Sequence, residues 1–452
     1  MFFILLLLCA LSLTSCFSIG IKAEDYLSVP RLPDAYYMLQ LRLDEEFADL
    51  EKLYPPSGGD NRAAIQLFDI NYDGVDEALV YSSLPGDDNP LRIYLFESLP
   101  SGDYRLIAKN EFPGEAFSAV RYLNIDGVGS CEIGLALSSG NTTKHLVVLS
   151  LIDGAFHTVV EDDFTLILSD VSGTANTDMT GSGNQDIVTI TQTMSDSGTT
   201  SCSIGLLSAG EDGRIARLEC GMSPFESVIQ ARHGYLSDGQ NAVFIDIRTI
   251  DGRYQTEIFT VKNDSGTNAA YSGTDNLSLV SIIPQSPEGE GLETLRAVNI
   301  STQSLAGHGL RPLVPISAPL PQESVSTYYE IDWYSYDSHG RKSLVVTTYH
   351  DTDWYFEVPP EMRSRLNVSR KVSYFGETET VFSYLDSGII VPFLKILMLT
   401  GADNRTTAIH GERFFLLEDR SNVYTAEILD SSVISESYVT EHFHKITREW
   451  FS

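Results

Sequence analysis

The stretch "FDINYDGVDEALVYS", residues 68–82, places an acidic loop directly before an apolar run. Four carboxylates and one amide surround a single glycine, and the chain then continues as "EALVYSS". Across the whole chain, aromatic and β-branched residues dominate the apolar runs, which favours strands over helices. The loop is either a calcium site or an acidic turn, and this choice decides most of what the sequence indicates about function.

Two related stretches follow, "YLNIDGVGSCEIGLALSS" at 122–139 and "NTDMTGSGNQDIVTITQT" at 176–193. The acidic residues at the start of the three runs, Glu77, Glu132 and Asp186, are 55 and 54 residues apart. A weaker fourth copy, "YLSDGQNAVFIDIRT", has an alanine in the matching place, 56 residues further on. A nearly constant period over four units predicts a repeat architecture.

Each unit contains several short strands separated by turns. The first unit has "EALVYSS", "LRIYLFE" and "RLIAKNEF", and the second has "EIGLALSS", "KHLVVLSLI" and "HTVVEDD". Three or four antiparallel strands in a tandem repeat predict an all-β protein, a β-propeller. Roughly 385 residues at a period of about 55 give about seven blades, and six or eight also fit. The repeat weakens after Thr249, although "IDWYSYDSHGRKSLVVTTYH" (331–350) again has a polar loop before a strand.

Both ends of the predicted propeller have helical patterns. A short N-terminal helix is expected in "PDAYYMLQLRLDEEFADLEKL", which opens with Pro33 at a plausible first helical position. A C-terminal helix is expected because Val439, Phe443, Ile446 and Trp450 recur at helical steps. These helices either pack on the propeller or bind a partner. The expected organisation is a signal peptide (1–15), an anchored segment with the helix (16–60), the propeller (61–431) and the C-terminal helix (432–452).

The formal net charge is −32. This charge makes nucleic acid and anionic membrane surfaces unsuitable partners, and it favours cations, including metals. The alternative is that the acidity only keeps an exposed protein soluble. The sequence contains no His-Glu-x-x-His, nucleophile elbow, phosphate loop or Cys-x-x-Cys motif. His442 and His444 are close in sequence, but two residues two apart do not share a helix face, so a joint metal site is not expected there.

The first fifteen residues are apolar and too short to span a bilayer, and they indicate a signal peptide. The residues Leu13 to Cys16 then resemble a bacterial lipobox, in which the cysteine becomes the lipidated N-terminus. This resemblance implies a membrane partner through lipid on Cys16 and a location on the outer face of the cell membrane. One departure is that no Lys or Arg precedes the apolar run. An ordinary secretory signal is the alternative.

Three further cysteines remain, Cys131, Cys202 and Cys220. The latter two lie symmetrically about Glu211 in the turn "SAGEDGR". If this turn joins a hairpin, they form either a cross-strand disulfide or two small buried side chains, and the second interpretation is favoured.

The loops resemble the calcium loops of FG-GAP repeats, found in integrin α-subunit propellers and in bacterial VCBS-type lipoproteins. The shared pattern is Asp-x-[Asp/Asn]-x-Asp-Gly-x-x-[Asp/Glu] before a strand. The resemblance covers residues 63–260 well. It implies that positions 1, 3, 5 and 9 ligate calcium through side chains, and position 7 through its carbonyl. Ca²⁺ takes six to eight oxygen ligands, and a glycine permits the bend that brings them together.

Carried over to this chain, the resemblance implies three calcium sites of graded strength. The first loop has the ligands Asp69, Asn71, Asp73, Val75 and Glu77. The third has Asp178, Thr180, Ser182, Asn184 and Asp186, with fewer charges. The second has Asn124, Asp126, Ser130 and Glu132, but Val128 replaces its fifth-position ligand. We expect the first loop to bind structural calcium, the third to bind weakly, and the second to bind weakly or not at all. The alternative is that these are acidic turns that no longer bind metal.

These features predict a non-catalytic cell-surface lipoprotein that binds an extracellular protein or glycan ligand. The aromatic stretches "TYYEIDWYSYD" and "YHDTDWYFEVPP" are interpreted as sheet core, and the alternative is an exposed sugar-binding surface. A different class of function, an extracellular glycan lyase or hydrolase of the propeller type, would need a cluster such as His233, Tyr336 and His339.

Overall fold

The computed structural model describes residues 34–140, 143–167, 178–194, 198, 200–210, 213–263, 277–283, 296, 298–320, 328–372, 377–401 and 408–446. The predictions for the signal segment, Cys16 and Trp450 lie outside these residues. Within them, the chain is an all-β protein of several antiparallel sheets with two α-helices, as the sequence predicts. By compactness the chain divides into two units. The first consists of Met1–Tyr54, Ala64–Asp69 and Asp73–Phe112, and the second of Pro55–Ala63, Ile70–Tyr72 and Pro113–Ser452.

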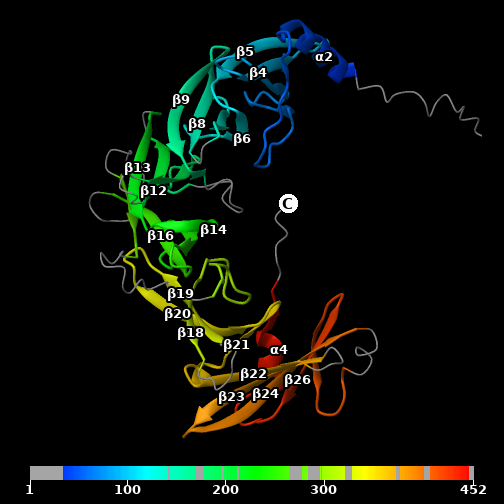
Figure 1. Ribbon diagram of the computed structural model, residues 1–452, viewed down its shortest axis with the longest axis vertical. Coiled ribbons are helices and arrows are strands. Elements are labelled where there is room, and N and C mark those ends of the chain that lie inside the picture. The colour runs from blue at the N-terminus through cyan, green and yellow to red at the C-terminus, as the bar shows by residue number, and fades with distance from the viewer. Residues whose placement is uncertain are drawn as a thin grey trace, which may run out of the picture. The chain divides into compact units, whose positions relative to one another are not determined.

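Among the residues that the structure describes, the first unit contains one helix and one sheet (Figure 1). Its elements are α2 (Asp34–Glu46), β1 (Lys52–Leu53), β2 (Ile65–Phe68), β3 (Glu77–Ser83), β4 (Leu91–Ser98) and β5 (Tyr104–Phe112). The sheet order is β1-β3-β4-β5, and β2 also pairs with β3. Helix α2 begins directly after Pro33, where a helix was expected, and it packs Leu39 and Leu43 in one cluster with Tyr94 and Phe96.

A buried carboxylate joins the strands of the first unit. Glu51 Oε1 accepts hydrogen bonds from the hydroxyls of Ser82 (2.5 Å) and Tyr94 (2.7 Å). Its Oε2 accepts from the Ala48 amide (3.0 Å) and the Arg92 guanidinium (2.9 Å). Burial alone would raise the pKa of Glu51, but these hydrogen bonds and the Arg92 charge lower it overall. The buried charge is therefore fully paired, as it must be to be tolerated in a core.

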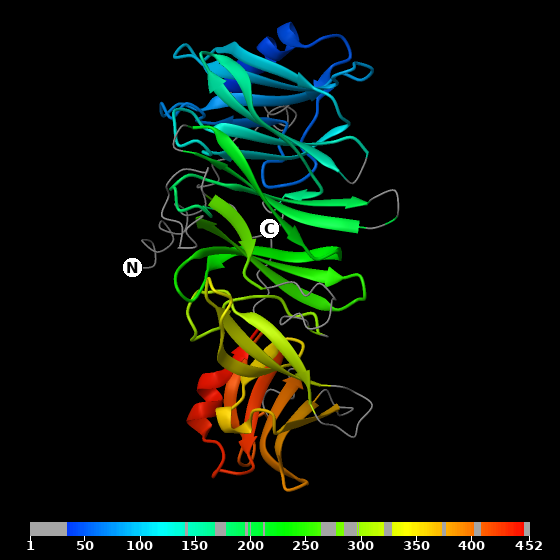
Figure 2. The same ribbon diagram turned by 90° about the vertical axis from the view of Figure 1, so that its left-hand side faces the viewer.

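The described ranges of the second unit form five antiparallel sheets (Figures 1 and 2). The first sheet has the strands β6 (Ala116–Leu123), β7 (Glu132–Ser138), β8 (Lys144–Ile152) and β9 (Ala155–Phe164). The second has β10 (Leu166–Ile167), β11 (Ile187–Met194), β12 (Thr200–Ala209) and β13 (Ile215–Met222). The third has β14 (Phe225–Tyr235), β15 (Asn241–Thr249), β16 (Tyr254–Asn263) and β17 (Leu277–Ser281). In each of these sheets the strand order follows the chain.

The last two sheets of the second unit are less regular. The fourth has β18 (Val314–Pro319), β19 (Tyr329–Tyr336), β20 (Lys342–His350), β21 (Trp354–Glu357) and, at its edge, β27 (Phe443–Lys445). The fifth has β22 (Leu366–Val372), β23 (Glu377–Asp386), β24 (Ile389–Thr400), β26 (Asn422–Ile428) and β25 (Phe414–Glu418), in that order. A short 3-10 helix, η4 (Pro360–Met362), lies between the two sheets in sequence, and α4 (Glu436–His442) precedes β27.

Consecutive sheets of the second unit pack against one another through apolar side chains. Ala136 and Leu146 of the first sheet share a cluster with Leu207 of the second. Other clusters join the second sheet to the third, the third to the fourth, and the fourth to the fifth. Because both faces of an inner sheet are covered, its central strands, such as β12 and β15, are buried along most of their length.

The sequence repeat corresponds to the sheets. Strands β3 and β7 begin at Glu77 and Glu132, and β11 begins one residue after Asp186. The fourth copy lies at β15. One period of about 55 residues is therefore one sheet, and the polar loop precedes β3, β7, β11 or β15, the second strand in the order of its sheet. The loop at 337–340 lies between β19 and β20 and precedes the third strand in the order of its sheet, so it departs from this plan by one strand.

The expected C-terminal helix is shorter than its apolar spacing suggests. Helix α4 begins after Ser435, whose Oγ accepts a hydrogen bond from the Tyr438 amide (3.3 Å), and it ends at His442. Phe443 lies in β27 and pairs with Phe356 of β21. The prediction of a helix through Phe443 and Ile446 is wrong, because pairing with a sheet edge takes precedence over local periodicity.

Candidate functional site

In the first acidic loop, residues 69–77, aspartate side chains accept hydrogen bonds from the backbone amides of the same loop. Asp69 accepts hydrogen bonds from the amides of Asp73 (3.1 Å) and Gly74 (2.9 Å), and Asp73 accepts one from the Val75 amide (2.8 Å). Gly74 has a φ of 86°, which the tight bend requires. Glu77 is buried at the start of β3, whereas Asn71, Asp73 and Val75 are exposed.

The second acidic loop, residues 124–132, has a similar form. Asn124 Oδ1 accepts from the Gly127 amide (2.7 Å), and Asp126 Oδ1 accepts from the Val128 amide (2.8 Å). Glu132 is fully buried, and its Oε2 accepts from the Ile125 amide (2.9 Å).

Burial, together with the nearby Asp126 charge, raises the pKa of Glu132 to about 7, against the opposing effect of the Ile125 amide. Ser130 donates instead to the Leu151 carbonyl (3.3 Å), so its hydroxyl is engaged outside the loop.

In the third acidic loop, residues 178–186, Asp178 accepts from three successive amides. These belong to Gly181 (2.7 Å), Ser182 (3.1 Å) and Gly183 (2.9 Å). The Asn184 amide donates to the Ser182 hydroxyl (3.2 Å). The loop is thus an acidic turn whose first carboxylate caps the backbone.

Asp186, the last residue of the third loop, accepts hydrogen bonds from the backbone near the start of the loop. Its Oδ2 accepts from the amides of Met179 (2.7 Å) and Thr180 (3.1 Å), while its Oδ1 is buried without a hydrogen-bond donor. Burial raises the pKa of Asp186 to about 6, although the Ser208 hydroxyl and the two amides oppose this rise. An orphaned buried oxygen is the kind of group that a cation would satisfy.

The second and third loops lie side by side. The Asn124 amide donates to Gln185 Oε1 (2.8 Å), and the Gln185 amide donates to the Asn124 carbonyl (2.9 Å). Gly127 approaches the Asn184 side chain so closely that a Cβ at position 127 would lie 2.4 Å from Asn184 Oδ1. The two acidic turns therefore form one continuous polar edge of the second unit.

These loops offer oxygen ligands of the type that calcium prefers. In the part of the chain that the structure describes, no group of three or more His, Cys, Asp or Glu side chains is already arranged around one point as a metal site. The ninth-position carboxylates of the second and third loops instead turn onto backbone amides. Calcium binding at either loop would compete with these hydrogen bonds.

A second constellation, the histidine–glutamate cluster, consists of His308, Glu357, His442 and His444. Glu357 lies on β21 with its side chain 6% exposed, and His308 Nε2 lies 3.2 Å from both of its carboxylate oxygens. His444 Nε2 lies 3.3 Å from Oε1, and His442 Nε2 lies 4.0 Å from Oε2. Burial would raise the pKa of Glu357, but the hydrogen bonds with His444 and His308 hold it below its usual value.

Aromatic rings position this cluster. The Tyr438 ring stacks on His442 with centroids 4.0 Å apart, and Tyr355 packs against His444 at 4.9 Å. The Tyr355 hydroxyl also accepts a hydrogen bond from the Ala306 amide (3.2 Å), which holds the turn that carries His308. The cluster thus draws on three separate segments of the chain.

Sequence reasoning missed this cluster because it placed His442 and His444 on one helix. In the structure His442 ends α4 and His444 lies on β27, so the helix-face argument does not apply. The His-x-His spacing is the local signal that was present, but it does not place the two imidazoles on one face here, because His442 is helical and only His444 lies on a strand. Nothing local indicates His308 or Glu357, since their proximity comes from the tertiary fold.

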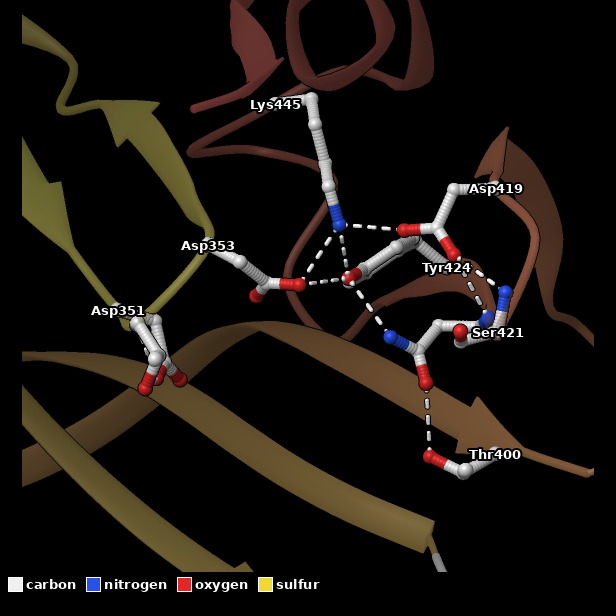
Figure 3. Close-up of polar contacts among 9 residues, drawn as sticks. Asp351, Asp353, Thr400, Asp419, Ser421, Tyr424 and Lys445 are labelled. Atoms are coloured by element: carbon white, nitrogen blue, oxygen red, sulfur yellow. Dashed lines mark hydrogen bonds and ion pairs between the residues drawn. The ribbon is translucent and has the colours of Figure 1, made fainter. Parts of the chain in front are cut away.

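A third polar group, the lysine network, surrounds Lys445 (Figure 3). Lys445 Nζ donates to Asp353 (2.7 Å), to Asp419 and to the Tyr424 hydroxyl (2.8 Å). Tyr424 in turn donates to Asp353 (2.6 Å) and accepts from Asn422 (3.4 Å). All three ammonium protons of Lys445 are engaged in these hydrogen bonds. We therefore interpret Lys445 as a structural residue and not as a reactive amine.

The charges of the lysine network support one another. Hydrogen bonds to Asp353, Asp419 and Tyr424 raise the pKa of Lys445 despite its burial. Burial opposes ionisation of Asp419, yet Lys445 and the amides of Ser421 and Asn422 lower its pKa to about 2. The network joins β27 to the loop before β26, and so ties the C-terminal segment to two sheets.

The remaining residues singled out by sequence have other neighbours. His233 packs edge-on against Tyr235, with centroids 5.9 Å apart, and Tyr336 is buried at the end of β19. His339 lies in the following loop, with its Nδ1 3.4 Å from the Ser338 hydroxyl.

The aromatic stretches are sheet core. Trp333, Tyr336, Tyr349, Trp354 and Tyr355 are all at most 5% exposed. The favoured interpretation of these stretches as core is confirmed for these residues.

The cysteines of the described region are free thiols. Ile204, rather than Cys202, pairs with Cys220, and Cys202 pairs with Met222, so the two cysteines are diagonal neighbours. They pack in the same apolar cluster as small side chains.

No family model matches the sequence. No curated protein matches it either. A solved structure of a protein from Lactobacillus plantarum aligns with 75% of this chain and 86% of its own, at 14% identity and a TM-score of 0.24. This score is too low to indicate a common fold. None of the helices in the described ranges is both long and apolar enough to cross a bilayer.

Proposed function

We propose that this chain is a non-catalytic lipoprotein of the bacterial cell surface, whose β-propeller binds an extracellular protein or glycan. The observation that supports this proposal most is the equivalence of one sequence period with one antiparallel sheet, with consecutive sheets of the second unit packed face to face. Three of the six described sheets have four strands, the number typical of a propeller blade, and the other three have five. The six sheets of the described residues would be six blades, within the range that the period allows.

In this proposal calcium stiffens the acidic loops. The first loop has the fullest oxygen set, and the third has the orphaned Asp186 Oδ1. Bound calcium would supply positive charge to groups that otherwise repel one another, and it would order the loop edge that faces a ligand. The net charge of −32 fits a partner that is neutral or basic.

The membrane anchor is proposed at Cys16. Metabolic labelling with a fatty acid, followed by fractionation of producing cells, tests this part directly. We expect label in the membrane fraction for the wild type and none for Cys16→Ser. Cys202→Ser is the matched control, since Cys202 is a buried thiol of the apolar core. Label that persists in Cys16→Ser would rule out the proposed anchor.

Ligand binding is tested with the purified protein on an array of bacterial and host glycans, in calcium and in chelator. Binding of the protein to particular glycans on the array, without cleavage of those glycans, supports the proposal. Cleavage of a bound glycan would instead favour the lyase or hydrolase alternative. If the protein binds no glycan on the array, it is next immobilised and tested for binding of extracellular matrix and cell-surface proteins.

A further inference from the structure

We propose that His308, Glu357, His442 and His444 form a binding site for one divalent transition-metal ion of the zinc class. The site is distinct from the oxygen-rich acidic loops, and it does not depend on the proposed surface-binding function. Imidazole nitrogens with one carboxylate oxygen are a donor set that zinc accepts in four-coordinate sites, whereas calcium prefers oxygen alone.

Two of the distances from the Glu357 carboxylate to histidine nitrogens are close to those between neighbouring ligands of one tetrahedral ion. With metal–ligand bonds of about 2.1 Å, neighbouring ligand atoms lie about 3.4 Å apart. Glu357 Oε1 lies 3.2 Å from His308 Nε2 and 3.3 Å from His444 Nε2. His442 Nε2 is the outlier, at 4.0 Å from Oε2.

The tautomer of His442 gives an independent argument. Its Nδ1 lies 2.8 Å from the Tyr438 carbonyl oxygen, which can only accept a hydrogen bond, so Nδ1 carries a proton. Nε2 is then the ring nitrogen that faces the Glu357 carboxylate, and it is the atom available to a metal ion shared with that carboxylate. A histidine whose second nitrogen donates to a backbone carbonyl is also the usual arrangement around metal-bound imidazoles.

The charge balance of Glu357 supports the same conclusion. Three histidine side chains face its buried carboxylate. A carboxylate buried to this degree is stabilised by a nearby positive charge, and a divalent ion bound among these side chains would supply one.

The site is accessible and requires a small rearrangement. The side chains of His308, His442 and His444 are 24%, 30% and 22% exposed, so an ion can reach the cluster from solvent. Since the cluster does not already have the arrangement of a metal site, binding has to draw His442 closer to the carboxylate. His442 is the last residue of α4, where a side-chain shift disturbs little of the helix.

The test uses chelator-stripped protein that carries no histidine tag, titrated with Zn²⁺ by calorimetry. We expect one saturable site per chain that excess Ca²⁺ does not displace. The double variant His308→Gln/His444→Gln should lower the Zn²⁺ affinity on the order of 100-fold. His145→Gln is the matched control, because His145 is an exposed histidine that pairs with Asp163 outside the cluster, and its affinity should equal that of the wild type.

A second measurement needs no variant and therefore does not depend on whether the double variant folds. Co²⁺ bound to the wild-type protein should give the intense visible absorption of a tetrahedral site, and Zn²⁺ should abolish it. Weak absorption of octahedral type, an absence of saturable Zn²⁺ binding, or equal affinity in the folded double variant would each overturn the proposal.

Discussion

At the scale of single residues, His350 shows how the core sets the chemistry of a side chain. It lies on β20 between two rings, with centroids 5.7 Å from Trp333 and 5.2 Å from Tyr355. Its Nε2 is buried without a hydrogen-bond partner. Burial lowers the pKa of His350 from 6.5 to about 3, so the ring stays neutral in the folded protein.

This burial predicts a loss of stability in mild acid. The folded-state pKa is lower than the unfolded one, so the stabilisation is present above pH 6.5 and is lost as the pH falls towards 3. Below pH 6.5 the unfolded chain binds a proton at His350 that the folded protein does not bind. This difference lowers the free energy of unfolding by up to about 1.4 kcal/mol per pH unit. Urea unfolding at pH 7 and pH 5.5 should show this loss in the wild type.

The comparison with His350→Phe isolates the effect of one ring. Phenylalanine keeps the stacking and cannot be protonated, so its stability should fall less between the same two pH values. His157→Phe, on the exposed part of β9, serves as the control and should behave as the wild type does. An identical pH dependence in wild type and His350→Phe would contradict the assignment of a neutral buried ring.

At the scale of elements, the approach of one sheet to the next depends on a glycine. Gly340 lies in the loop between β19 and β20 with a φ of 76°, and a Cβ there would lie 2.4 Å from the Ile282 carbonyl oxygen. Ile282 follows β17 of the preceding sheet. Because the obstructing atom belongs to the backbone, it cannot swing aside as a side chain can.

Gly340→Ala should therefore destabilise the chain by about 2 kcal/mol or more, through strain at positive φ and separation of the two sheets. Gly388→Ala is the matched control, since Gly388 has a φ of 87° but a Cβ there would meet no described atom within 4 Å. Thermal unfolding of the two variants separates the destabilisation caused by a positive φ at alanine from the destabilisation caused by the close contact with the Ile282 carbonyl. Equal destabilisation would show that the sheets are not in close contact at Gly340.

The C-terminal strand depends on a fastening of a different kind. Lys445 joins β27 to Asp353 and Asp419, so Lys445→Met would leave two carboxylates without their cation. We expect a loss of about 2 kcal/mol or more, because removing one partner of a partly buried ion pair leaves uncompensated charge. Hydrogen exchange of the β27 amides should accelerate. Lys371→Met, on the exposed end of β22, should leave both measurements unchanged.

The elements that the sequence predicted correctly are those with local signals. The acidic residue, the glycine bend and the apolar run of the first two loops occur in sequence, so the starts of β3 and β7 follow from them. The end of α4 could not be predicted in this way. Phe443 continues the helical spacing from Val439, and only its pairing with Phe356, far away in sequence, makes it a strand residue.

The same distinction separates the two kinds of candidate site. The acidic loops are contiguous, so residues 69–77 can be assigned as possible ligands from their order alone. The histidine–glutamate cluster joins residues 308, 357, 442 and 444, and their meeting depends on the addition of β27 to the edge of β21. No pattern within a short window indicates such a contact.

At the scale of the whole molecule, a repeat of about 55 residues accounts for the succession of similar sheets. Each inner sheet buries both faces against its neighbours, so no single sheet is expected to be stable alone. The loops that precede β3, β7 and β11 carry most of the acidic pattern, and the charge of this pattern is the reason to propose calcium. A stabilising ion would then act on the chain through its loops rather than through its core.

The most direct test of the calcium-stabilised propeller is a calorimetric titration of the chelator-stripped protein with Ca²⁺, repeated for Asp73→Asn and Asp76→Asn. Asp73 is a proposed ligand in the first loop, and Asp76 is its acidic neighbour outside the ligand set, so the pair is matched in charge. We predict saturable binding that raises the melting temperature in the wild type and in Asp76→Asn, with weakening of about tenfold or more in Asp73→Asn. The absence of heat and of any thermal shift in the wild type, or equal binding by both variants, would contradict the proposed role of calcium in the first loop.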